Sequence, residues 1–193
     1  MAKRSVSALI VLTLLLSACR AKPYEWHGAT YEPPRQAAPI PFEATGNRGT
    51  FDLSAQAGHV VVLYFGYINC PDICPATLAN LAWVHQQLGD NEGDLVVLFA
   101  TVDPDRDTLP ALANYLSAFD TQFIGLRAQQ SEVDQVTAAY GVYSGPAAED
   151  AVHSVEHSAV LFLIDRDGQL RAHYTWDVSR ADLLADIEHL MSG

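Results

Sequence analysis

Continuous runs of apolar residues alternate along this chain with segments whose apolar residues recur every three or four positions. A continuous apolar run predicts a strand that is covered on both faces of a sheet, and the wider spacing predicts an amphipathic helix. The expected strands cover residues 51–53, 60–65, 95–102, 123–126, 160–164 and 170–174. The expected helices cover residues 76–88, 109–119, 131–140 and 179–191.

Residues that favour helix ends and turns support these boundaries. The sequence Asp165-Arg166-Asp167-Gly168 predicts a hairpin between the last two strands. The residues expected at helix ends are Pro75 in a first turn, Asp107 or Thr108 and then Ser131 as caps, and Gly141 as a stop. Strands that alternate with helices predict an α/β fold, here a thioredoxin-like sandwich with helices on both faces of a central mixed β-sheet. We expect this domain to span residues 42–193.

The first residues indicate an export signal. Lys3 and Arg4 precede the mostly apolar residues 5–16, which are too few to span a bilayer. The end of this run, Leu16-Ser17-Ala18-Cys19, resembles a bacterial lipobox. We therefore expect residues 1–18 to be a lipoprotein signal peptide and Cys19 to carry lipid on the extracytoplasmic face of a bacterial cell membrane, periplasmic or at the cell surface. The alternative is ordinary cleavage near Ala18, which leaves Cys19 as a free thiol.

Residues 19–41 are expected to form a membrane tether. Five prolines fall between Arg20 and Pro41, and the segment has no periodic apolar pattern. Such a composition is typical of an extended linker, here between the anchor and the folded domain.

The charge of the chain excludes one class of partner. Eleven Lys and Arg residues stand against 23 Asp and Glu residues, a formal net charge of −12 that becomes −14 once residues 1–18 are removed. Because such a surface repels phosphate groups, we expect no nucleic-acid binding. The charge suits a cationic partner or a cation, although solvation alone explains it equally well.

Two cysteines follow the apolar run 60–67 in the sequence Cys70-Pro71-Asp72-Ile73-Cys74-Pro75. If Cys74 lies in a first helical turn and Cys70 just before it, the free N–H groups and the helix dipole should lower the thiol pKa. The resulting thiolates could attack disulfides or bind a metal. The gap of three residues, rather than the two of a thioredoxin C-x-x-C pair, favours metal. A static disulfide is the structural alternative, but a loop this small would stabilise the fold only weakly.

One histidine has a context that suits a ligand. His157 stands just before the expected strand 160–164, in the loop that faces the cysteines in a thioredoxin-type sheet, and no proline occupies the place of the thioredoxin cis-proline. Two thiolates and one imidazole suit Cu(I) through sulfur and Cu(II) through nitrogen. His153 is the weaker candidate. The histidines expected to be surface or packed residues are His27, His59, His85, His173 and His189.

Residues 65–75, Phe-Gly-Tyr-Ile-Asn-Cys-Pro-Asp-Ile-Cys-Pro, resemble the signature of the Sco/SenC family of copper-binding cytochrome c oxidase assembly proteins. Three later blocks also resemble the family, at residues 102–108, 119–126 and 156–168, so that the likeness covers Phe42 to the C-terminus. The resemblance implies that Cys70, Cys74 and His157 bind one copper ion per chain, as Cu(I) or Cu(II). The acidic residues within 103–107 could suggest a divalent-ion site, but we expect a strand-to-helix turn with a cap there.

The resemblance also implies a function. It indicates a membrane-anchored copper metallochaperone that delivers copper to the dinuclear copper centre of cytochrome c oxidase, with the copper-site subunit of the oxidase and another copper carrier as partners. The alternative is an enzyme, either a peroxidase-like relative or a thiol–disulfide oxidoreductase that keeps the oxidase cysteines reduced with Cys70 and Cys74 as its redox pair. A copper-responsive sensor would use the same ligands. We expect a carrier rather than an enzyme.

Overall fold

A central mixed sheet organises the computed structural model, which describes residues 23–146 and 155–192. Its eight strands follow the order β1-β10-β9-β4-β5-β6-β2-β3. Three neighbouring strands run parallel, namely β4 (Val60–Gly66), β5 (Leu95–Thr101) and β6 (Ile124–Arg127). On the other side of β4, the antiparallel hairpin of β9 (Val160–Ile164) and β10 (Gln169–Thr175) continues the sheet. The expected hairpin and central strands are confirmed.

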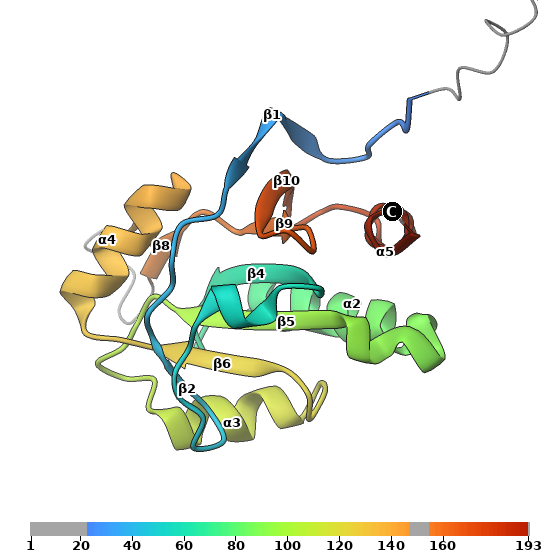
Figure 1. The fold of residues 1–193 in the computed structure, drawn as a ribbon. Helices are drawn as coiled ribbons and strands as arrows, with labels where there is room; N and C mark the ends of the chain where they lie inside the picture. The colour runs from blue at the N-terminus through green and yellow to red at the C-terminus, as the bar shows by residue number, and fades with distance from the viewer. Residues whose placement is uncertain (1–22, 147–154, 193) are drawn as a thin grey trace, which may run out of the picture.

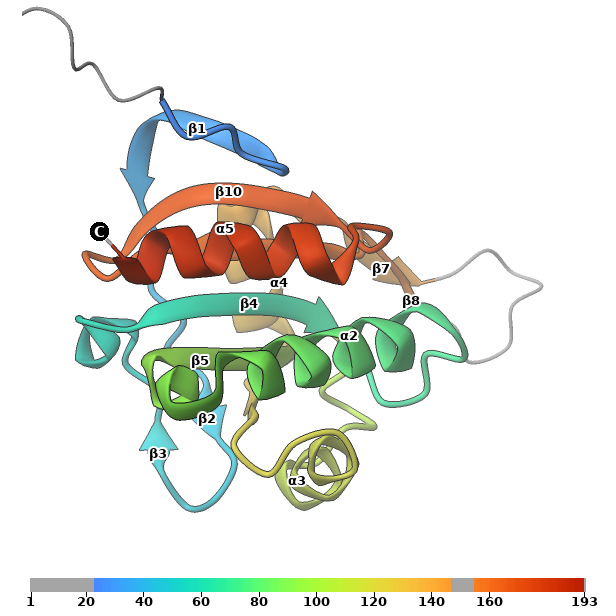
Figure 2. The same ribbon diagram turned by 90° about the vertical axis from the view of Figure 1, so that its right-hand side faces the viewer.

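Helices cover both faces of this sheet, as expected for the thioredoxin-like class. Figure 2 shows α2 (Ile73–Leu88), α3 (Leu109–Ser117) and α5 (Arg180–Ser192) in front of the sheet and α4 (Gln130–Tyr140) behind it. Two 3-10 turns also occur among the described residues, η2 (Leu53–Gln56) and η3 (Gly89–Asp94). No helix among the described residues is long and apolar enough to cross a membrane.

The helix ends show which of the expected caps are used. The Thr108 side chain accepts the N–H of Ala111 at 3.3 Å and begins α3, and Gly141 ends α4 with a φ of 72°. The expected cap at Ser131 is wrong, because α4 begins one residue earlier. Its N-cap is Gln129, whose backbone N–H donates to the Glu132 carboxylate at 3.0 Å in a capping box.

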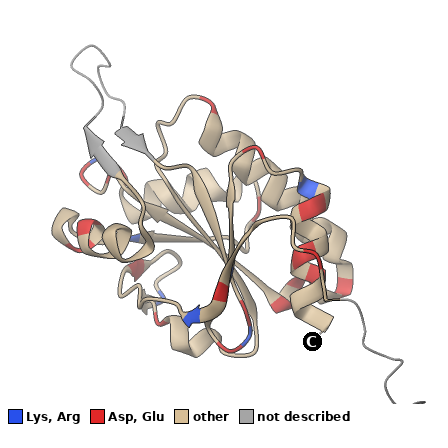
Figure 3. Ribbon diagram, turned by 90° about the horizontal axis from the view of Figure 1, so that it is seen from above, with Lys and Arg blue, Asp and Glu red and all other residues tan. Residues whose placement is uncertain are grey.

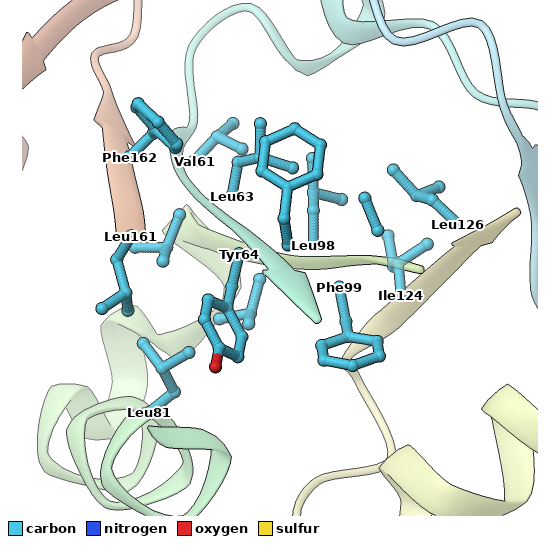
Figure 4. Close-up of a cluster of buried hydrophobic side chains, with 14 of the residues drawn as sticks. Val61, Leu63, Tyr64, Leu81, Leu98, Phe99, Ile124, Leu126, Leu161 and Phe162 are labelled. Carbon is cyan, nitrogen blue, oxygen red and sulfur yellow. The ribbon is translucent and has the colours of Figure 1, made fainter. Parts of the chain in front are cut away.

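The core lies on both sides of the central strands. Every residue of β4 is buried, and each of its residues pairs in parallel register with β5, from Val60 with Leu95 to Gly66 with Thr101. In Figure 4 the alternating side chains separate onto two faces, with Leu63 and Leu98 on one face and Tyr64 and Phe99 on the other. Strands covered on both faces explain the continuous apolar runs of the sequence.

Part of the expected tether belongs to the folded domain. β1 (Ala29–Gln36) pairs antiparallel with β10 and forms one edge of the sheet. Figure 1 shows β1 beside β10. Farther along, Ile40 is buried and leads to the short hairpin of β2 (Glu43–Ala44) and β3 (Gly49–Thr50). The sequence pattern misses β1 because nearly all of its side chains are exposed and because an edge strand tolerates proline.

Two smaller differences concern short segments. The strand expected at residues 51–53 is wrong, since Asp52 instead caps η2 by accepting the N–H of Ser54 at 2.9 Å. A small antiparallel hairpin that the sequence did not predict forms between β7 (Ser144–Pro146) and β8 (Val155–His157). Acidic positions outnumber basic ones and lie on several sides of the domain (Figure 3), so the negative charge does not mark a single site.

Candidate metal centre

Strand β4 and helix α2 bring the two cysteines together at one edge of the sheet. The chain leaves β4 at Gly66 and enters α2 at Ile73, so Cys70 precedes the helix and Cys74 lies in its first turn. Both are buried thiols that form no disulfide, with 8% of Cys70 and none of Cys74 exposed. The backbone N–H of Cys74 points at Sγ of Cys70, 3.4 Å away. The expected placement of a dithiol at a helix start is confirmed.

The sulfur of Cys74 is closely surrounded by neighbouring residues. The hydroxyl of Tyr64, on β4, donates a hydrogen bond to this sulfur at 3.3 Å. A Cβ added to Gly66 would lie 2.9 Å from the same sulfur and 2.6 Å from Cε2 of Phe99. Real Cβ atoms do not approach other atoms so closely, and only glycine at position 66 leaves room for both neighbours.

Burial dominates the acidity of Cys74. It raises the pKa of this thiol to about 12, although the Tyr64 hydrogen bond acts in the opposite direction. The expected lowering of the Cys74 pKa is therefore wrong, because loss of solvent around the sulfur outweighs the helix start. Burial likewise raises the pKa of Tyr64, so its hydroxyl keeps its proton and remains a donor. A metal that binds Cys74 must displace the thiol proton, and binding will therefore release a proton.

Asp107 supports the cysteine loop from the turn between β5 and α3. Its Oδ2 atom accepts the backbone N–H of Ile68 at 3.1 Å and the hydroxyl of Thr101 at 2.6 Å. The carboxylate is almost fully buried, and burial raises its pKa. The sequence analysis assigned this segment to a turn and a cap, and missed its link to the cysteines. The sequence contained a signal for this link. The cysteine loop and the acidic segment each follow one of two neighbouring parallel strands, and the carboxyl ends of such strands meet at one edge of the sheet.

His157 is the last residue of β8, where it pairs with Ser144 of β7. The next residue, Ser158, donates its backbone N–H to the carbonyl of Tyr143 at 3.0 Å. Because β9 is antiparallel to β4, with Leu161 opposite Tyr64, the chain enters β9 at the edge where the cysteines lie. The side chain of His157, and Cys19 and His153 altogether, lie outside the described residues. Their assigned roles stay predictions.

The other histidines have structural contacts away from the cysteines. Buried His85 lies 2.9 Å from the Asp120 carboxylate, and His27 lies 2.8 Å from that of Asp186. The remaining contacts are His59 with the Gln56 carbonyl, His173 with the rings of Tyr31 and Phe162, and His189 with the ring of Tyr24. Within residues 23–146 and 155–192, no three described His, Cys, Asp or Glu side chains cluster as a ready metal site.

The fold and the paired thiols define a thioredoxin-like protein whose helix start can carry redox or metal chemistry. Comparison with known sequences narrows this class. The SCO1/SenC family model matches residues 31–192, and the chain belongs to this family.

Individual relatives agree with this assignment. The human mitochondrial SCO1 homolog is 36% identical over 134 residues, which cover 67% of this chain and 44% of that protein. A SCO2-like protein of Rickettsia prowazekii is 32% identical over 148 residues, covering 75% and 72% of the two chains. The matched part is thus less than half of the human relative. The solved structure of ScoI from Bradyrhizobium japonicum with copper bound has a TM-score of 0.69 and 30% identity, covering 80% of this chain and 99% of the other.

Proposed function

We propose that this protein is a copper carrier whose cargo binds to Cys70, Cys74 and His157. The observation that carries the proposal is the pair of thiols, neither of them in a disulfide, at the start of α2, with the sulfur of Cys70 facing the N–H of Cys74. Thiolate sulfur is a soft ligand and selects copper over hard divalent ions. Family membership and the copper-bound structure of the Bradyrhizobium relative support the choice of metal.

The two sulfurs have different roles in this proposal. Cys74 is fully buried and lies on the inner side of the site, whereas 8% of the surface of Cys70 is exposed. An incoming ligand from a partner protein therefore meets the metal on the Cys70 side. Copper leaves by stepwise exchange, in which each thiolate or imidazole of the carrier is replaced by one from the partner. His157 completes the three-ligand set and leaves a coordination position open for this exchange.

The proposed destination is the dinuclear copper centre of cytochrome c oxidase, with the copper-site subunit of the oxidase and another copper carrier as partners. This assignment rests on the resemblance to the Sco/SenC family. A lipid on Cys19 would hold the domain at the outer face of the cell membrane. A membrane anchor raises the effective concentration of the carrier near a membrane-embedded oxidase.

Copper content of the purified domain tests the site. Reduced protein should bind one copper ion per chain, and the Cu(II) form should show a strong thiolate-to-copper charge-transfer absorption. Cys70→Ser or Cys74→Ser should abolish tight binding, because a hydroxyl is a poor ligand for copper. Full copper binding by both serine variants would contradict the proposal.

His157→Ala tests the third ligand, with His153→Ala as its matched control. The first variant should weaken Cu(II) binding markedly and stop oxidase assembly in cells, and the second should do far less. Normal assembly with His157→Ala, together with loss in the cysteine variants, would favour the alternative function.

That alternative is a thiol–disulfide oxidoreductase. The observation in its favour is that Cys70 and Cys74 lie next to each other without a disulfide, with the backbone N–H of Cys74 3.4 Å from Sγ of Cys70. An exchanger needs a thiolate and a resolving cysteine but no imidazole. Disulfide-reduction rates of wild type and His157→Ala should be equal in either case, so the oxidase assembly assay is the measurement that separates the two functions.

Cell fractionation tests the anchor. The wild-type protein should sediment with membranes, and Cys19→Ser should release it or block its processing, because a serine side chain cannot hold acyl chains. Recovery of the wild type in the soluble exported fraction with an unmodified Cys19 would refute the anchoring.

A further inference from the structure

Tyr64 contributes a polar group to the cysteine site from the centre of the sheet. Its side chain has no exposed surface, and its hydroxyl donates to Sγ of Cys74 at 3.3 Å. The bond joins β4 to the first turn of α2, which carries Cys74. In Figure 4 the Tyr64 ring lies on the same face as Leu81 and Phe99. A ring packed in this way holds its hydroxyl in place whether or not a metal is bound.

The surroundings also hold the sulfur in place. The rings of Tyr64 and Phe99 pack with their centroids 5.8 Å apart, and the backbone of Gly66 leaves no spare room beside Phe99 and Cys74. The sulfur thus lies against the Gly66 backbone with the phenol aimed at it. When copper binds, the thiol proton of Cys74 passes to solvent, and the phenol O–H faces a thiolate.

Building on the proposed copper site, we propose that Tyr64 is a positioning residue that donates a hydrogen bond to the Cys74 thiolate of the copper-loaded protein and thereby favours Cu(I) over Cu(II). A thiolate gives less electron density to Cu(I) than to Cu(II). Its sulfur is therefore more negative in the Cu(I) form, and the hydrogen bond is stronger there. Hydrogen bonds around a cysteine sulfur tune copper redox potentials in this way.

Tyr64→Phe tests the inference because it removes only the hydroxyl. In the Cu(II) form, the charge-transfer band should move to lower energy, since an unbonded thiolate is a better donor. The ratio of Cu(I) to Cu(II) affinity should fall about tenfold, at the low end of what outer hydrogen-bond partners contribute. A tenfold change corresponds to a potential about 59 mV more negative for a one-electron couple. Site-specific 3-fluorotyrosine at position 64, a stronger donor, should move the band to higher energy.

Tyr140→Phe is the matched control. Tyr140 is also buried, but its hydroxyl donates to the carbonyl of Ala38 at 2.8 Å. It ends α4, the helix that Figure 2 shows on the opposite face of the sheet from α2. This variant should leave the band and the affinity ratio unchanged. The spectrum records only folded, copper-bound molecules, so a loss of stability does not hide the result.

The possible results of these experiments lead to different conclusions about Tyr64 and about the copper site. An unchanged band and ratio in copper-loaded Tyr64→Phe would overturn the role of Tyr64 and leave the copper function intact. An equal shift in Tyr140→Phe would overturn it as well. Absence of copper binding in the wild type would instead refute the proposed function.

Discussion

Nδ1 of His27 lies 2.8 Å from Oδ1 of Asp186, which follows 159 residues later in the chain. The same carboxylate accepts the backbone N–H of His27 at 3.0 Å and the hydroxyls of Tyr24 and Tyr174, each at 2.7 Å. Four donors from the N-terminal segment and β10 therefore converge on one side chain of α5. This carboxylate, which has no exposed side-chain surface, attaches the segment before β1 to the domain.

Asp186→Ala should destabilise the domain. The substitution leaves the buried hydroxyl of Tyr174 without its acceptor, and an unsatisfied buried donor costs about 2 kcal/mol. Urea unfolding at neutral pH measures the loss. Asp182→Ala is the control, because this half-exposed carboxylate meets His27 only at 3.6 Å and should change the free energy of unfolding little. Equal effects of the two variants would contradict the central role of Asp186.

The contact between His27 and Asp186 should depend on pH. The hydrogen bond to Asp186 raises the pKa of His27 above its ordinary value in the folded state. Its stabilising contribution is therefore complete below the unfolded-state pKa and is lost as the pH rises through the folded-state pKa. For Asp186, burial acts to raise the pKa, but the hydrogen bonds from His27, Tyr174 and Tyr24 outweigh it and lower the pKa. Its contribution is present above the unfolded-state pKa and is lost as the pH falls through the folded-state value.

His27→Gln measures this dependence, because glutamine donates a hydrogen bond but carries no charge. The difference in free energy of unfolding between wild type and variant should be larger near pH 5.5 than near pH 8.5. A difference that is the same at both pH values would show that the charge of His27 contributes nothing.

Gly66→Ala should disturb the cysteine site and the core together. The added methyl group meets the sulfur of Cys74 and the ring of Phe99, and overpacking of this kind costs about 1–3 kcal/mol. Displacement of the sulfur should also weaken copper binding. Gly93→Ala is the control, because its Cβ would meet no atom within 4 Å. Thermal unfolding and copper titration should show losses for the first variant only.

Asp107→Ala should loosen the loop that carries Cys70. The N–H of Ile68 and the hydroxyl of Thr101 lose their acceptor, at a cost of about 1–3 kcal/mol. Faster hydrogen exchange at Ile68 and lower thermal stability are the expected results. Exposed Asp105→Ala is the matched control from the same acidic segment. Unchanged exchange at Ile68 in the Asp107 variant would show that the loop is held by other contacts.

Local pattern alone was enough for much of the fold and for the placement of the thiols. The apolar runs of β4 and β5 predict strands buried on both faces, and the sequence from Cys70 to Pro75 predicts a dithiol at a helix start. These features depend on neighbouring residues, because backbone geometry sets strand and helix periodicity within a few positions. The identity of the proposed cargo came from the resemblance to a family rather than from periodicity.

Only the tertiary structure decided how distant residues act on these elements. From the sequence alone, Tyr64 is predicted to be a core residue and Asp107 a turn residue. The folded sheet brings both of them to the cysteine loop. β1 has no apolar alternation and is recognisable only by its pairing with β10. The acidity of Cys74 likewise follows from how completely α2 and β4 enclose its sulfur, because desolvation depends on every group packed around a site and not on its neighbours in the chain.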